Sequence, residues 1–165
     1  MYRRINRMRT SRLDNVLCGV AGEYFVAAEL SRRGYIASIT LRNTRGVDIL
    51  ASNRDATKSV AIQVKTNQRG AAEWILTESI EREQTREDLA ENLFFVFVNL
   101  PPTGEPPSYY IASRREVARL AREGHANWLA RPGRGGKPHS VNNPIRKFKD
   151  LEGKYRDAWA TLGLD

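Results

Sequence analysis

The chain has 165 residues and carries 27 Lys and Arg against 19 Asp and Glu, a formal net charge of +8. This length predicts a single domain with a substantial core, and no apolar run approaches the roughly 18 residues of a membrane span. The single cysteine, Cys18, excludes an internal disulfide and a cysteine-based zinc site. The arginine-rich first thirteen residues lack the apolar segment of a secretory signal, so we expect a cytoplasmic protein.

The positive charge is concentrated in two segments that contain no acidic residue. Residues 1–13 hold five arginines, and residues 131–149 hold six Lys and Arg, whereas the remainder has 16 basic and 19 acidic residues. A near-neutral body with two basic segments is typical of proteins that bind a polyanion. Because 21 of the 27 basic residues are arginine, which pairs bidentately with phosphate, we expect contact with nucleic acid.

Hydrophobic periodicity predicts a helix followed by three strands in the first half of the chain. The helix covers residues 14–34, with Asp14 or Asn15 as its N-cap and Gly34 at its end. A turn over residues 52–55 separates the second and third strands. The three strands are predicted over residues 35–41, 47–51 and 59–65.

The rest of the chain predicts three further strands, one of them short, and two further helices. Residues 93–98 form a continuous apolar run, typical of a strand buried on both faces. The other expected elements are a short strand over 74–76, a charged and partly helical segment over 78–92, a strand over 109–112, a helix over 113–123 ended by Gly124, a mobile loop over 131–143 and a last helix over 151–162. This order predicts an α/β protein with a mixed β-sheet flanked by helices. We expect one domain with its core at about 14–124, a basic N-terminal arm, and a basic loop and terminal helix over 125–165.

Four polar side chains fall at positions where a sheet protein would otherwise carry apolar ones. Glu23 lies on the apolar first helix, and Asp48 lies among hydrophobic residues at the second strand. Gln63 and Lys65 are two residues apart on the third strand, so they project from one face. The Asp48 carboxylate, the Gln63 amide oxygen and the Val64 carbonyl together suit Mg²⁺ or Mn²⁺. A lysine beside such an ion can orient the attacking water.

The pattern Glu23, Gly46-Val47-Asp48 and Gln63-Val64-Lys65 resembles the PD-(D/E)XK nuclease superfamily, and more closely its Mrr-type branch with Gln in the last motif. The resemblance covers residues 14–66. It implies a restriction-endonuclease-like three-layer fold, with Asp48 as the principal metal ligand, Gln63 as the variable ligand and Lys65 as the catalytic lysine. Glu23 is the helix carboxylate, which would supply the second negative charge to the metal, directly or through a water. Two features depart from the family pattern: Val47 replaces proline, and Gln63 removes one negative charge.

The resemblance implies a Mg²⁺-dependent phosphodiesterase that acts on DNA in the manner of a restriction enzyme or resolvase, and a homodimer where both strands are cut. We expect phosphate contacts from Arg42, Arg45, Arg134 and Lys137. Two alternatives remain open: a catalytically degenerate nucleic-acid-binding module of the same fold, and an interaction protein whose basic segments bind an acidic partner. His125, His139 and Trp128 are interpreted as surface or packing residues without a metal or base-stacking role.

Overall fold

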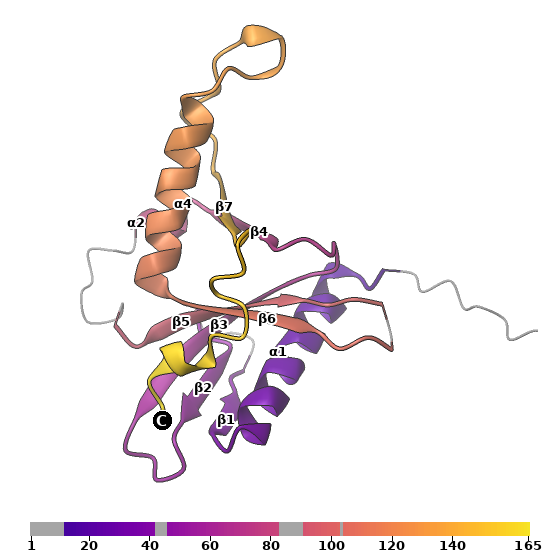
Figure 1. Ribbon diagram of the computed structural model, residues 1–165, viewed down its shortest axis with the longest axis vertical. Helices are drawn as coiled ribbons and strands as arrows, with labels where there is room; N and C mark the ends of the chain where they lie inside the picture. The colour runs from indigo at the N-terminus through magenta and orange to yellow at the C-terminus, as the bar shows by residue number, and fades with distance from the viewer. Residues whose placement is uncertain (1–11, 42–45, 83–90, 103) are drawn as a thin grey trace, which may run out of the picture.

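The computed structural model describes residues 12–41, 46–82, 91–102 and 104–165 (Figure 1). Its main sheet has the strand order β1-β2-β3-β5-β6. β3 and β5 run parallel and the other neighbouring pairs run antiparallel, which confirms the predicted mixed sheet. The five strands are β1 (Ile36–Ile39), β2 (Ile49–Ser52), β3 (Ser59–Asn67), β5 (Leu93–Asn99) and β6 (Ser108–Ser113).

Helix α1 (Asn15–Arg32) covers one face of this sheet (Figure 1). It begins where predicted, because the Asp14 side chain accepts hydrogen bonds from the backbone N–H groups of Val16 and Leu17, each at 2.9 Å. Its buried face packs against the inward side chains of β2, β3 and β5 in a continuous apolar core. At Gly22 the helix approaches β3 so closely that an added Cβ would lie 1.8 Å from Thr66 Oγ1, so the sequence needs glycine there.

The opposite face is covered by a second layer that contains its own small sheet. Strands β4 (Glu73–Thr77) and β7 (Ile145–Lys149) pair antiparallel, and α2 (Ser79–Arg82) and α4 (Arg114–Leu129) lie beside them (Figure 1). Phe148 of β7 stacks on Phe97 of β5 with ring centroids 4.1 Å apart. The sheet therefore has a core on each side, and β5 is buried on both faces as predicted.

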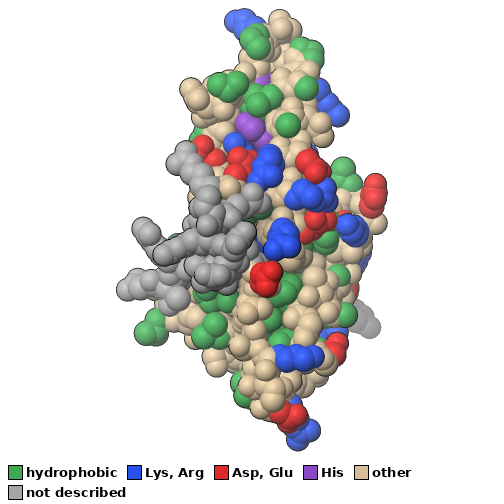
Figure 2. All heavy atoms as spheres, turned by 90° about the vertical axis from the view of Figure 1, so that its left-hand side faces the viewer, with side chains coloured by type: hydrophobic (Ala, Val, Ile, Leu, Met, Phe, Trp, Pro, Cys, Tyr) green, Lys and Arg blue, Asp and Glu red, His purple; other side chains and the backbone are tan. Residues whose placement is uncertain are grey.

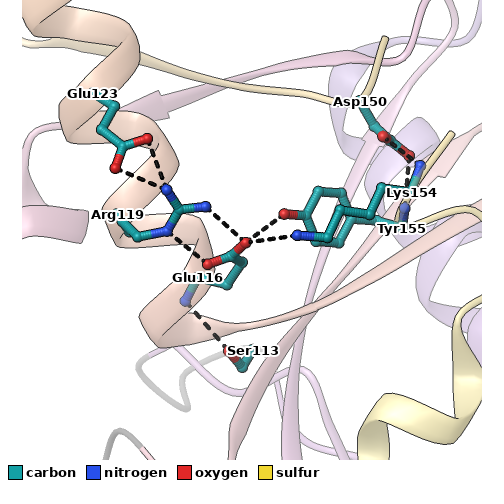
Figure 3. Close-up of polar contacts among 7 residues, drawn as sticks. All are labelled: Ser113, Glu116, Arg119, Glu123, Asp150, Lys154 and Tyr155. Carbon is teal, nitrogen blue, oxygen red and sulfur yellow. Dashed lines mark hydrogen bonds and ion pairs between the residues drawn. The ribbon is translucent and has the colours of Figure 1, made fainter. Parts of the chain in front are cut away.

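The base of α4 is fixed to the C-terminal segment by a group of polar contacts (Figure 3). Ser113 caps the helix by accepting the Glu116 N–H, as the sequence predicts. Glu116 accepts hydrogen bonds from Arg119 at 2.8 Å, from Tyr155 at 2.5 Å and from Lys154 at 3.3 Å. These donors, led by Arg119, lower the pKa of Glu116 to about 2.

Two expectations about secondary structure require correction, and one strand was not predicted. α4 does not end before Gly124 but continues to Leu129, since one glycine costs a helix only about 1 kcal/mol. Strand β7 occupies residues assigned from the sequence to the basic C-terminal part. The residues expected to form a last helix contain only the 3-10 turn Trp159–Leu162, because Gly153 and Asp157 have positive φ angles. β4 belongs to the small sheet with β7. The described part of the chain contains no candidate membrane-spanning helix.

Candidate functional site

Asp48 lies at the position where β2 begins and departs from β3. Regular pairing of the two strands ends at Ile49 and Ile62. The Asp48 N–H donates to the Ile62 carbonyl at 2.8 Å, while Asp48 Oδ2 accepts a hydrogen bond from the backbone N–H of Val64 at 2.7 Å. The carboxylate thus accepts the β3 N–H that a backbone carbonyl would accept if β2 continued as a regular strand. The second carboxylate oxygen, Oδ1, does not take part in this bond.

The segment that leads to Asp48 is held by strand β1 and the residue after it. Thr40 donates its hydroxyl to the Val47 carbonyl at 2.6 Å, and its backbone N–H donates to the Asp48 carbonyl at 2.9 Å. These bonds fix the backbone on both sides of the peptide between Val47 and Asp48. The position of the carboxylate therefore follows from β1 as well as from β3.

The Val64 carbonyl faces the same strand edge as the Val64 N–H. In a β-strand, one residue directs both its N–H and its C=O toward the same neighbouring strand. Since the Val64 N–H is bound by Asp48, the carbonyl of Val64 is directed to the side on which Asp48 lies. Two oxygen donors of the expected set, one charged and one neutral, therefore share this edge of β3.

Gln63 and Lys65 project from the opposite face to α1, in register with Phe95 and Phe97 of β5. Both line a cavity of about 170 Å³ between the main sheet and the second layer. Its lining comes from β3 and β5 of the main sheet, from β4, α2 and α4 of the second layer, and from the segment before β2: Gly46, Gln63, Lys65, Ile75, Leu76, Thr77, Ser79, Ile80, Phe95 and Arg114. Lys65 also lines a second hollow of about 260 Å³, together with Arg12 and Arg69. The lysine thus lies between two hollows that carry three further arginines.

Arg114 is a pocket residue that the sequence analysis did not identify. It is the first residue of α4, only 5% of its surface is exposed, and its Nη2 donates to the Ile80 carbonyl at 3.5 Å. Its neighbour Arg115 points outward, with 73% of its side chain exposed. The signal was the helical spacing, because Arg114 falls on the apolar stripe formed by Val117, Ala118 and Ala121.

Glu23 is positioned by α1 and lies on the other side of the sheet from Gln63 and Lys65. It follows Gly22, the point of close approach to Thr66 of β3, and is half-buried. Neither Glu23 nor Asp48 lines the 170 Å³ cavity. The structure thus brings Gln63 and Lys65 together in one cavity, places Asp48 on the backbone between them, and holds Glu23 on the opposite face.

The expected phosphate contacts are distributed differently. Arg42 and Arg45 lie outside the described residues. Arg134 and Lys137 lie in the loop that follows α4, beyond the helix end that is remote from the cavity (Figure 1).

The oxygen donors near Asp48 agree with the preferences of Mg²⁺ and Mn²⁺ but supply little charge. Carboxylate, amide and carbonyl oxygens are the ligands of such hard cations. Within the described ranges, no group of three or more His, Cys, Asp and Glu side chains is placed to hold a metal ion. A cation here would therefore depend on Asp48 for charge, with Gln63 and Val64 as neutral donors.

Comparison with solved structures finds a similar architecture in a homing endonuclease. The chain is similar to the bacterial homing endonuclease I-Ssp6803I, with a TM-score of 0.50 and 15% identity over 92% of this chain and 94% of that chain. The fold is restriction-endonuclease-like. Two further structures show weaker similarity: the Holliday junction resolvase Hjc of Archaeoglobus fulgidus (TM-score 0.46, 13% identity, 80% of this chain and 84% of that chain) and the fusselovirus nuclease D212 (TM-score 0.40, 15% identity, 69% and 77%). No family model and no curated protein matches the sequence.

Proposed function

We propose that this chain is a metal-dependent phosphodiesterase that cleaves DNA, with an Mrr-type variant of the PD-(D/E)XK site. One observation carries the proposal: the Asp48 carboxylate is bound to the backbone N–H of Val64, the residue between Gln63 and Lys65. This contact supports the proposal because it joins Asp48 to the part of β3 that carries Gln63 and Lys65.

Asp48, Gln63 and the Val64 carbonyl would hold Mg²⁺ or Mn²⁺. When bound, such an ion supplies a Lewis acid that lowers the pKa of water and offsets charge on the phosphate. Lys65 lines the same cavity as Gln63, where its ammonium group can orient the attacking water and bind a phosphate oxygen.

Arg114 adds a second cation to the same cavity. Because it is buried and fixed at the start of α4, its charge is presented with little loss of side-chain freedom. Lys65 and Arg114 together give the cavity the electrostatic sign that a phosphodiester requires. Glu23 lies on the opposite face, so we assign it a smaller contribution, through a water or through its charge.

The experiment is a cleavage assay with supercoiled, linear and branched DNA, in Mg²⁺ or Mn²⁺ and in EDTA. We expect cleavage of at least one substrate in metal and none in EDTA. Binding of all three substrates without cleavage in either metal would instead support the degenerate binding module. The neutral Gln63 side chain is the reason for considering that alternative, because it removes one negative charge from the metal site. Sedimentation on duplex DNA tests the homodimer that we propose for cleavage of both strands.

A further inference from the structure

Helix α4 extends past the sheet, and the segment after it forms one end of the molecule (Figure 1). We define the arm tip as residues 125–140, which comprise the last turn of α4 and the loop with its 3-10 turn Arg134–Gly136. Figure 2 shows Lys and Arg side chains at this end, with histidine side chains below them. The tip lies far from the cavity that contains Lys65.

The positive charge of the arm tip is not compensated by acidic residues. No Asp or Glu occurs between residues 124 and 149. Arg131, Arg134 and Lys137 are exposed, and none of them forms an ion pair with another described residue. Nearer the base of the arm the arrangement differs, because Lys147 and Lys149 pair with Glu73 at 2.6 and 2.8 Å. The tip therefore offers three cations to an external anion.

Ring stacking and close packing hold the loop of the arm tip in place. Trp128 lies between two histidines, with ring centroids 3.8 Å from His139 and 5.4 Å from His125. The Gly133 N–H donates to the Lys137 carbonyl at 2.8 Å, and an added Cβ at Gly133 would lie 2.9 Å from His139 Cε1. A loop that is fixed in this way presents its cations with a smaller entropic cost on binding.

The length of α4 sets the distance between the two basic regions. Its first residue, Arg114, lines the cavity with Lys65. Its 16 residues rise about 1.5 Å each, or about 24 Å in total. Since B-DNA rises about 3.4 Å per base pair, this distance corresponds to about seven base pairs.

We propose that the arm tip binds the sugar-phosphate backbone of duplex DNA about seven base pairs from the phosphate held at the Lys65 cavity. The proposal rests on the proposed function, in that the cavity is the other contact point. Two contact points joined by a rigid helix make binding bivalent, so affinity rises sharply once one duplex spans both. Backbone contacts of this kind carry no base specificity.

The test measures binding to duplexes of about 6 to about 24 base pairs by fluorescence anisotropy in EDTA, where cleavage is absent. For the wild-type chain we expect a step of at least tenfold in affinity once the duplex exceeds about eight base pairs. The double variant Arg134→Ala/Lys137→Ala should show only the gradual rise that added length gives any chain. On the longest duplex, its slope of log K against log salt should be shallower by about 1.8, since each lost phosphate contact contributes about 0.9.

A matched control removes the same charge from the turn between β2 and β3, at the opposite end of the molecule (Figure 1). Arg54→Ala/Lys58→Ala, both exposed positions, should keep the step and the salt slope. A step in affinity as large as that of wild type in the arm-tip variant would overturn the proposal. So would an equal loss of the step in the arm-tip variant and in the control variant. Competition by polyglutamate as effective as that by DNA of equal charge would assign the tip to an acidic protein and would also overturn it.

The outcomes separate this proposal from the proposed function. A chain that shows the step but cleaves no DNA supports the arm contact and contradicts the nuclease. A chain that cleaves DNA without the step supports the nuclease and contradicts the arm contact.

Discussion

The carboxylate of Asp48 accepts a hydrogen bond from the backbone N–H of Val64, with Oδ2 2.7 Å from the nitrogen. Asp48 stands at the start of β2 and Val64 near the middle of β3, sixteen residues apart. The contact has a structural role, because it satisfies a strand N–H beyond the last β2–β3 pair. It also fixes the acidic side chain beside the residues expected to act on phosphate.

Substitutions of Asp48 separate these two roles. Asp48→Asn keeps an acceptor oxygen for the Val64 N–H, so we expect it to unfold at nearly the wild-type denaturant concentration. Asp48→Ala leaves that N–H without its partner, which costs about 1–3 kcal/mol. Urea denaturation of the three proteins measures the difference, and equal stability of the Asn and Ala variants would contradict the structural role.

Gln63 limits the charge available to a cation. Gln63→Glu adds a second carboxylate from the same sheet, and ligand charge is a main determinant of affinity for hard cations. We expect Mn²⁺ to bind the variant about tenfold more tightly, a change of about 1.4 kcal/mol. Calorimetric titration measures it, with Gln68→Glu as a control on an amide beyond the end of β3. An equal gain in both variants would show that the effect is one of net charge.

Lys65 is assigned to the water and the phosphate, not to the metal. Lys65→Ala should therefore lower kcat for DNA cleavage by at least about 100-fold and leave Mn²⁺ affinity within about twofold of wild type. The same two measurements on Lys58→Ala, a lysine in the β2–β3 turn, provide the control. Loss of Mn²⁺ binding in Lys65→Ala would contradict the assignment.

Much of the central sheet could be predicted from the sequence because its signals are local. Asp14 begins α1 through its own side chain, and the apolar run at 93–98 is the strand buried on both faces. Strand β7 was not predicted, although its side chains alternate between buried and exposed. One of its two inward residues is Arg146, which is buried because it pairs with Glu81 at 2.5 Å. A partner 65 residues away is invisible to a pattern of hydrophobicity.

For the candidate site, the sequence indicates which residues to expect but says less about how they are arranged around the sheet. Strand alternation places Gln63 and Lys65 on one face, as the structure shows. The spacing of the motif contains no information on which face α1 covers, so the separation of Glu23 from Gln63 and Lys65 was not predicted. Arg114 was not identified because its charge is typical of an exposed position, although its helical spacing places it on the buried stripe of α4.

The polar cluster at the base of α4 predicts a dependence of stability on pH. The folded state lowers the pKa of Glu116 from 4.5 to about 2, chiefly through its hydrogen bonds with Arg119. A lowered carboxyl pKa stabilises the fold fully above pH 4.5, and this stabilisation is lost as the pH falls through about 2. At pH 6 the free energy of unfolding of wild type should be about 1–2 kcal/mol higher than that of Glu116→Gln. The difference is no larger because partial exposure to solvent screens the ion pairs.

Urea denaturation at several pH values measures this difference. The difference in free energy of unfolding between wild type and Glu116→Gln should decrease as the pH falls from 4.5 to 2. Glu123→Gln, which removes a second and more exposed partner of Arg119, should differ less from wild type. A difference that is constant from pH 6 to pH 2 would show that the charge of Glu116 is not its source.

The rate of plasmid nicking by wild type and Asp48→Asn in Mg²⁺ tests the central claim most directly. The variant retains an acceptor for the Val64 N–H and removes only the negative charge, so the comparison isolates the role of the carboxylate in chemistry. We predict that wild type converts supercoiled DNA to the open circle and that Asp48→Asn is slower by at least about 100-fold, with both proteins equally folded. Equal nicking by the two proteins would contradict the assignment of Asp48 to a metal-dependent site.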